Sequence, residues 1–271
     1  MPLNFTIRSL VSRLYSLVHD NPSQPTMEPT KVTDAPSIGD MSRSMVRMKE
    51  CGFAPTFIID VGANQGSWSR SALEIWPGTP IALIEPQSDF TEQLETLASD
   101  HPQCTVYAVG AAASDTTLIQ TIWPDRQGSS FVPPRSEEAL NEGRQIETPV
   151  RRLDSILPKE TFDEGDSILI KLDIQGYELE AIEGSGHLLA KAEALIIETT
   201  LFETMQGRPI ASDYVKVLAD LGFELYDISG FLHRPLDGAL SQVDFIFARR
   251  EGILRKSNRW QKEDYPGAPA N

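Results

Sequence analysis

Short apolar runs alternate with amphipathic segments along most of this chain of 271 residues. The apolar runs have the length and branching typical of buried strands, and the segments between them have helical periodicity. This alternation favours an α/β fold, in which a mostly parallel, doubly wound, Rossmann-like sheet is covered by helices on both faces. We expect seven strands, at residues 57–61, 81–85, 105–109, 167–172, 194–198, 223–227 and 243–248.

The alternation is interrupted between residues 113 and 152. Two β-like runs, at 117–123 and 146–153, flank a polar segment that contains Gly, Ser and Pro. Residues of these types punctuate loops and turns. We interpret the interruption as an inserted β-hairpin and loop that cover the active site.

Composition divides the chain into three parts. Residues 1–39 contain an amphipathic segment, at 3–18, and then a Pro-, Ser- and Thr-rich stretch that is typical of a flexible linker. The N-terminal extension is thus expected to be helical, and three interpretations of it stay open. It packs on the catalytic domain or a partner subunit, makes a peripheral membrane contact, or is weakly ordered. Residues 40–250 are predicted to form the catalytic domain, and residues 251–271 a disordered tail.

Charge and hydropathy exclude several classes of function. The formal net charge is −15, and the excess of acidic residues lies between the two ends of the chain, where it would repel the phosphates of a nucleic acid. No apolar run reaches the length of about 18 residues that a transmembrane helix needs. Cys51 and Cys104 have neither metal-binding nor disulfide spacing. We therefore expect a cytoplasmic protein that acts on a small molecule, while its oligomeric state stays open.

A glycine-punctuated loop follows the first predicted strand. The run from Asp60 to Gly66 reads Asp-Val-Gly-Ala-Asn-Gln-Gly, and a helix begins after it. Glycines at such a turn let the backbone approach a ligand, and the helix N-terminus adds oriented amide groups. The dinucleotide pattern G-x-G-x-x-G is incomplete, because Asn64 stands between Gly62 and Gly66. The acidic Asp60 suits a ligand that carries a sulfonium and an amino group.

The next two predicted strands also end in residues suited to an adenosyl ligand. Glu85 closes the second strand about twenty residues after the loop, where a carboxylate accepts hydrogen bonds from a ribose diol. Gly110 begins a run of small residues after the third strand, beside which a flat adenine ring would fit. A plain tight turn is the alternative interpretation of that run.

The fourth strand ends at Asp173, beside the crevice where doubly wound sheets bind ligands. Lys171, inside the strand, is expected to pair with an acid or to reach the crevice, because an unpaired buried cation is costly. Glu178 lies in the first turn of the following helix, where capping and a functional role are both reasonable interpretations.

These motifs together resemble the FkbM-type family of S-adenosylmethionine-dependent methyltransferases. The resemblance covers residues 53–249 and rests on Asp60–Gly66, Glu85-Pro86, Lys171–Glu178, Glu198 and the late strand at 243–247. It implies the class I methyltransferase fold, S-adenosylmethionine as the cofactor, and O-methylation of a small-molecule hydroxyl, such as that of a sugar, a secondary metabolite or a glycan.

The resemblance and the strand-end positions together define the expected site. Asp173 is the first candidate for orienting or deprotonating the acceptor hydroxyl, and Glu198 is the second. His233 is an alternative base, although a surface-loop role fits it better. No metal is predicted, and a Mg²⁺ held by the acids is the weaker interpretation. The residues expected to bind the cofactor are Asp60, Gly62, Asn64, Gly66, Glu85, Gly110 and Asp173.

Two other classes of function compete with a methyltransferase. One is an NAD(P)-dependent oxidoreductase on a similar sheet, against which Asn64 counts because it replaces the middle glycine of the dinucleotide pattern. The other is a non-catalytic scaffold that binds an adenosyl ligand. The acids at Asp173, Glu178 and Glu198 argue against a loss of chemistry.

Overall fold

The computed structural model describes residues 39–133 and 137–259. The amphipathic segment and linker predicted before residue 39 lie outside the described residues, as does the tail from residue 260. Within them, no helix is both long and apolar enough to cross a membrane. The helices are α2 (Met41–Glu50), α3 (Ser67–Ile75), α4 (Thr91–Asp100), α5 (Glu137–Glu142), α6 (Leu153–Ile156), α7 (Glu178–Glu183), α8 (Gly186–Lys191) and α9 (Ala211–Asp220).

Seven strands form the central sheet, in the order β3-β2-β1-β7-β8-β10-β9. Five of them, β1, β2, β3, β7 and β8, pair in parallel, and β10 runs antiparallel to β8 and β9. The strands are β1 (Phe57–Val61), β2 (Ile81–Ile84), β3 (Cys104–Tyr107), β7 (Ile168–Leu172), β8 (Ala192–Thr200), β9 (Phe223–His233) and β10 (Leu240–Arg249). The predicted Rossmann-like α/β fold of the class I methyltransferase type is confirmed.

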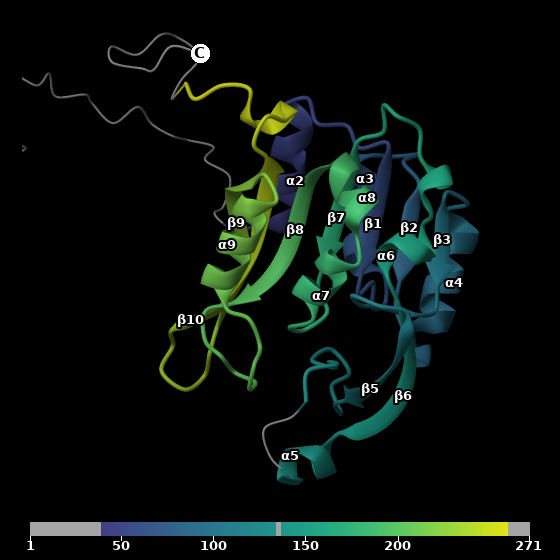
Figure 1. The fold of residues 1–271 in the computed structure, drawn as a ribbon, viewed down its shortest axis with the longest axis vertical. Coiled ribbons are helices and arrows are strands. Elements are labelled where there is room, and N and C mark those ends of the chain that lie inside the picture. The colour runs from purple at the N-terminus through teal and green to yellow at the C-terminus, as the bar shows by residue number, and fades with distance from the viewer. Residues whose placement is uncertain (1–38, 134–136, 260–271) are drawn as a thin grey trace, which may run out of the picture. The chain divides into compact units, whose positions relative to one another are not determined.

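Helices cover both faces of this sheet because its central strands are apolar on both sides. In β1, Ile59 and Val61 pack in one core with residues of α7, α8 and α9, whereas Ile58 packs in another with residues of α2, α3 and α4. Figure 1 shows α7, α8 and α9 on the near face, in front of the sheet. Such two-sided burial explains why β1 and β7 are mostly apolar, with Asp60 and Lys171 as their single charged residues.

The strand order reverses between β1 and β7. The chain moves outward from β1 to β3 and later returns on the other side of β1 as β7. The crevice outside the carboxyl ends of these two strands is therefore the position where doubly wound sheets bind ligands.

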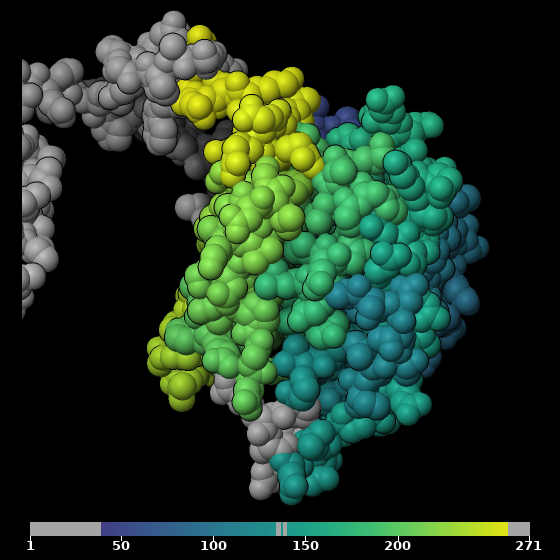
Figure 2. Space-filling model, in the orientation of Figure 1, coloured from purple at the N-terminus to yellow at the C-terminus, as the bar shows by residue number. Residues whose placement is uncertain are grey.

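A second, three-stranded sheet confirms the predicted insertion. Strands β5 (Thr116–Ile122) and β6 (Arg144–Arg151) form an antiparallel pair, and β4 (Gly110–Ala111) pairs in parallel with β6. Figure 1 shows this sheet and α5 beyond the ends of β7 and β8, and they occupy the lower end of the same face in Figure 2. The insertion thus lies at the carboxyl end of the central strands.

The chain is ordered past residue 250, in contrast to the tail predicted from 251 onward. A 3-10 turn at Ile253–Arg255 follows β10, and Leu254 is buried in the core beside α2 and α3. Glu193 of β8 accepts a hydrogen bond from the Ile253 N–H. One buried leucine among polar residues gave no periodic signal, which is why the sequence did not indicate this contact.

Candidate active site

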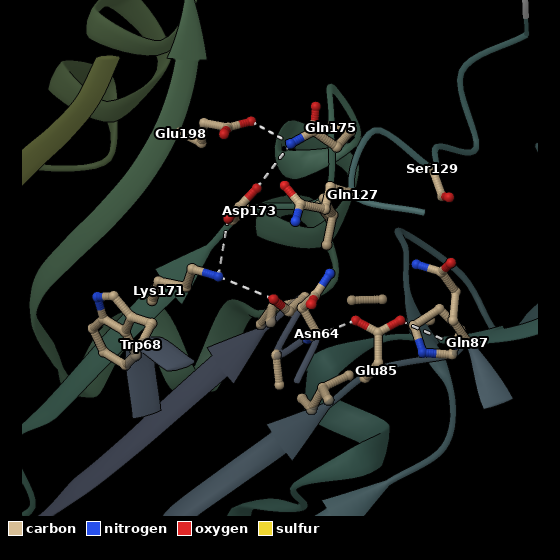
Figure 3. A pocket seen from close by; sticks show the side chains of 18 of the residues that line it. Asn64, Trp68, Glu85, Gln87, Gln127, Ser129, Lys171, Asp173, Gln175 and Glu198 are labelled. Atoms are coloured by element: carbon tan, nitrogen blue, oxygen red, sulfur yellow. Dashed lines mark hydrogen bonds and ion pairs between the residues drawn. The ribbon is translucent and has the colours of Figure 1, made fainter. Parts of the chain in front are cut away.

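A cavity with a volume of about 290 Å³ lies at the carboxyl ends of β1, β2, β7 and β8. Strands β1, β2 and β7 contribute their last residues or the residues that follow them, and β8 contributes Glu198 close to its end. The close-up in Figure 3 shows their polar side chains around a common space. Its volume is close to the lower end of the range of ligand pockets, which begins at about 300 Å³. The lining residues predicted from the sequence are Gly62, Asn64, Glu85, Gly110, Asp173 and Glu198.

The loop after β1 approaches β7 at Gly62. This residue has φ +79°, and a Cβ added there would overlap the carbonyl oxygen of Asp173. Asn64 also has a positive φ, of 50°, a conformation that asparagine tolerates better than most residues. The glycine at this position is therefore required by close packing between two strand ends, in addition to any ligand that the loop faces.

Gly66 does not line the cavity, although it was expected to bind the cofactor. It has φ +81° and precedes α3, and a Cβ there would lie 2.7 Å from a methyl group of Leu97. Its neighbours Gln65 and Ser67 line the cavity instead. The sequence correctly indicated that a glycine is needed here, but the close neighbour is a helix of the core.

Asp60 likewise stays out of the cavity, because its side chain points into the core and is fully buried. One carboxylate oxygen accepts a hydrogen bond from the Ser69 hydroxyl at 2.6 Å, and the other lies 3.2 Å from Lys171 Nζ. The expectation of direct contact with a cofactor is therefore not supported. Asp60 acts on the site through Lys171.

Lys171 lies at the centre of this polar cluster. Its ammonium contacts the Gly62 carbonyl at 3.0 Å, Asp60 at 3.2 Å and Asp173 at 3.3 Å. Burial alone would lower the pKa of Lys171, but the two carboxylates outweigh this effect and raise it. The lysine is thus a permanent cation that holds the ends of β1 and β7 together. The sequence had predicted that it would pair with an acid or reach the crevice, and it does both.

Glu85 follows β2 and is oriented by the backbone on both sides. Its Oε2 accepts the Asn64 N–H and its Oε1 accepts the Gln87 N–H, each at 2.9 Å (Figure 3). Burial raises the pKa of Glu85, and the two N–H donors oppose the rise. Each oxygen has a second lone pair. The carboxylate can therefore hold the loop in place and still accept hydrogen bonds from a ligand.

Gly110 lines the cavity where the small sheet begins. A Cβ added to it would lie within 3.0 Å of Phe131 and Val150. The glycine therefore allows the covering segment that precedes α5 to pack closely on β4. This segment also contributes Gln127, Ser129 and Phe131 to the cavity lining.

Asp173 and Glu198 lie at neighbouring strand ends and are joined by one side chain. The amide nitrogen Nε2 of Gln175 donates to Asp173 Oδ1 at 3.0 Å and to Glu198 Oε2 at 2.6 Å (Figure 3). Arg208 Nη2 lies 3.6 Å from the same oxygen of Glu198. The structure thus brings the two predicted catalytic carboxylates together.

Burial raises the pKa of Glu198 well above its usual value, and the negative charges of Asp173 and Glu178 raise it further. Asp173 has a different environment, because Lys171 contacts one of its oxygens and Gln175 the other. The two carboxyl groups therefore lie in different electrostatic environments.

Glu178 holds the loop that connects β7 to α7. It is fully buried and accepts the N–H groups of Ile174 and Gly176 and the hydroxyl of Tyr214, the last at 2.6 Å. Burial raises its pKa, and the Tyr214 hydroxyl opposes the rise. Glu178 does not line the cavity. Its contacts favour a structural role, in which it holds the loop, over a direct role in binding or catalysis.

His233 lies away from the cavity at the end of β9. Its Nδ1 is 2.9 Å from the carbonyl of Gly238, in the same hairpin. The alternative of His233 as the base is therefore not supported. Among the described residues, no group of three or more His, Cys, Asp or Glu side chains has the arrangement of a metal site.

Several side chains of the lining were not among the predicted site residues, including Trp68, Gln87, Gln127 and Gln175. Two have buried atoms without a hydrogen-bond partner in the described part of the chain, namely the indole nitrogen of Trp68 and the amide oxygen of Gln87. Their positions gave a signal, since Trp68 begins the helix after the glycine loop and Gln87 follows Glu85 by two residues. Gln127 lies in an irregular segment without such a signal.

Comparisons with known proteins agree with this arrangement. The family described as "Methyltransferase FkbM domain" matches residues 60–225, from the glycine loop to β9. The chain is also 25% identical over 222 residues to the methyltransferase sdnD of Sordaria araneosa, and the match covers 72% of this chain and 82% of that protein.

Two solved structures show weaker similarity. The methyltransferase FkbM of Methylobacillus flagellatus KT is 18% identical with a TM-score of 0.44, and the match covers 71% of this chain and 44% of that one. This chain thus spans less than half the length of that protein. The precorrin-6y C5,15-methyltransferase of Geobacter metallireducens GS-15 is 13% identical with a TM-score of 0.39, and the match covers 76% and 85% of the two chains.

Proposed function

Because the chain belongs to the FkbM methyltransferase family and is a methyltransferase, we propose that its donor is S-adenosylmethionine and its acceptor is a hydroxyl group of a small molecule. The proposal rests on one observation: Glu85, the glycine loop, Asp173 and Glu198 all line the same cavity. The first two suit an adenosyl compound, and the pair suits a group that must lose a proton.

The residues present fit S-adenosylmethionine. Glu85 is a buried carboxylate with spare lone pairs, as a ribose diol requires. The unpartnered indole N–H of Trp68 and amide oxygen of Gln87 offer one donor and one acceptor to a ligand. Buried polar groups are rarely left without a partner. We therefore assign cofactor binding to the loop at Gly62 and Asn64, to Glu85, to the small residues from Gly110, and to Trp68 and Gln87.

When bound, S-adenosylmethionine supplies an electrophilic methyl group, and an alcohol that receives it must release its proton. Glu198 is the better placed proton acceptor, because both groups that approach it in the described part of the chain, Gln175 and Arg208, contact the same oxygen, Oε2. Its other oxygen stays available. Asp173, with contacts to both oxygens, is assigned to orienting the hydroxyl.

The acidic character of the site favours a neutral or cationic acceptor. Glu85, Asp173 and Glu198 all line the cavity. Among the described residues, Lys171 is the only cationic side chain in the lining, and two carboxylates contact it. A phosphate-rich acceptor such as a nucleic acid would be repelled. A cytoplasmic location is part of the same proposal and rests on the spacing of the cysteines.

A titration with two ligands tests the proposed donor. The full chain is titrated calorimetrically with S-adenosylhomocysteine and, separately, with NAD. We expect binding of the first only. Binding of NAD without S-adenosylhomocysteine would replace the methyltransferase assignment with that of an oxidoreductase.

A labelling experiment tests the acceptor. The protein is incubated with methyl-labelled S-adenosylmethionine and a small-molecule extract, and the labelled product is analysed by mass spectrometry and NMR. We expect the label in a methyl ether, with turnover at least about 100-fold lower in Glu198→Gln, because a general base contributes about that much or more. A label on nitrogen or carbon would contradict the hydroxyl assignment.

A further inference from the structure

The side chain of Gln175 lies between two carboxylates in a strained loop. Its backbone has φ +57°, in the left-handed region that few residues other than glycine adopt. Such a conformation is unfavourable for a glutamine and persists only where the surroundings hold it. The cause of this strain is therefore to be found in the contacts of the residue.

Three groups hold the Gln175 peptide in this conformation. The carbonyl of Gln175 accepts a hydrogen bond from the Ser130 hydroxyl at 2.7 Å. The N–H groups on either side, of Ile174 and Gly176, donate to the buried Glu178 at 3.0 Å. The held backbone directs the side chain into the cavity, where its amide reaches Asp173 and Glu198 (Figure 3).

Asp173 and Glu198 both accept from the same nitrogen of Gln175, and two carboxylates in one site tend to keep a proton between them because their negative charges repel each other. The NH₂ group of a carboxamide has two hydrogens and no acceptor. It forms both of its hydrogen bonds only when each facing oxygen is an acceptor. A shared proton would compete with it for the same place.

We propose that Gln175 is a positioning residue that prevents Asp173 and Glu198 from sharing a proton, and so keeps Glu198 available as the proton acceptor. The inference rests on the role of Glu198 in the proposed function. The expected effect of Gln175 on the protonation of Glu198 does not depend on which acceptor binds. Gln175 acts through Glu198 and takes no part in bond making.

The charged groups around Glu198 determine how strongly its ionised form is disfavoured, and this is the effect that the Gln175 carboxamide opposes. Asp173 on β7, Glu178 on α7 and Asp244 on β10 disfavour a negative charge on Glu198, and Arg208 favours it. Asp244 lies opposite Glu198 in the register of β8 and β10, and burial together with Asp173 raises its pKa to about 7. Since three acids and one cation act on Glu198, the N–H of Gln175 that reaches Oε2 adds a second group that favours the ionised form.

The test follows the titration of Glu198 in the full chain without any acceptor. Glutamate is labelled with ¹³C at the side-chain carboxyl, and the Glu198 signal is identified by its loss in Glu198→Gln. In Gln175→Met, which keeps the length of the side chain but removes the donor, we expect the pKa of Glu198 to rise by about one unit or more, a tenfold higher proton affinity.

The matched control is Gln127→Met, because Gln127 also lines the cavity. It should leave the titration of Glu198 unchanged. A midpoint in Gln175→Met equal to that of the wild type, or an equal rise in the control, would overturn the proposal. If Gln175→Met does not fold, Gln175→Asn gives the same reading, because asparagine tolerates the positive φ and is one methylene too short to span both carboxylates.

Turnover gives a second reading once a hydroxyl acceptor is available. The pH profile of kcat for Gln175→Met should shift to higher pH by the same amount as the Glu198 titration and approach the wild-type plateau there. A loss that is equal at all pH values would show a merely structural role. Absence of turnover in the wild type would refute the proposed function and leave the titration result intact.

Discussion

Glu85 links the glycine loop to the second strand, since its two oxygens accept the N–H groups of Asn64 and Gln87. One side chain therefore has two tasks: it shapes the loop and presents lone pairs to the cavity. A carboxylate held by two backbone donors is oriented before any ligand arrives, so little conformational entropy is lost when a ribose binds.

Replacement of Glu85 by alanine should weaken binding of S-adenosylhomocysteine by about 1.5–3 kcal/mol for each charge-assisted hydrogen bond lost. Calorimetric titration measures the loss. Glu92→Ala, an exposed position on α4, serves as the control and should bind normally. Unchanged affinity in Glu85→Ala would refute the ribose assignment.

At the scale of elements, the site depends on how closely β1 and β7 approach each other. Gly62 allows this approach, and Lys171 fixes it through contacts with the Gly62 carbonyl, Asp60 and Asp173. The loop between β7 and α7 is held in turn by Glu178. The positions of the proposed catalytic carboxylates thus depend in part on Asp60 and Glu178, two buried groups that do not line the cavity.

Gly62→Ala should destabilise the fold by more than the strain of a positive φ alone. Gly78→Ala is the matched control, since Gly78 has φ +85° with nothing within 4 Å of an added Cβ. We expect the control to lose about 1 kcal/mol and Gly62→Ala at least about 2 kcal/mol more, because the carbonyl of Asp173 must move. Urea unfolding measures both. Equal losses would show that the strand ends separate easily.

At the scale of the whole molecule, the carboxyl end of the sheet collects negative charge. Burial raises the pKa values of Glu85, Glu178, Glu198 and Asp244. The chain also has a formal net charge of −15. Folding therefore works against the ionisation of several carboxyl groups at once.

The free energy of unfolding should consequently fall as pH rises. A carboxyl group whose folded pKa is raised contributes stability that is complete below its unfolded pKa and lost as pH passes through the folded pKa. For Asp244 this window runs from the usual 3.8 to about 7. Since one unit corresponds to about 1.4 kcal/mol, this residue contributes up to roughly 4 kcal/mol.

Urea unfolding at pH 5 and pH 8 measures this dependence. We expect a higher midpoint at pH 5. Asp244→Asn should reduce the difference between the two values, whereas the exposed Glu92→Gln should not. A midpoint that rises from pH 5 to pH 8 would contradict the raised pKa values.

The sequence by itself determined the fold class and the main strand-end residues of the cavity lining. Buried parallel strands are mostly apolar on both faces, so β1 and β7 were visible as short apolar runs. Parallel strands also bring their carboxyl ends to one edge of the sheet. Gly62, Asn64, Glu85, Gly110, Asp173 and Glu198 were therefore placed correctly around one crevice, because position along a strand is a local property.

Only the tertiary structure decided which of these groups face a ligand and which support others. Asp60 and Gly66 belong to the same run as Asn64, yet neither lines the cavity. The Asp60 carboxylate contacts Ser69 and Lys171, and Leu97 lies against Gly66. The bridge from Gln175 to Glu198 joins residues 23 positions apart. Such contacts depend on side-chain direction and on the packing of distant elements, which no local pattern of residues encodes.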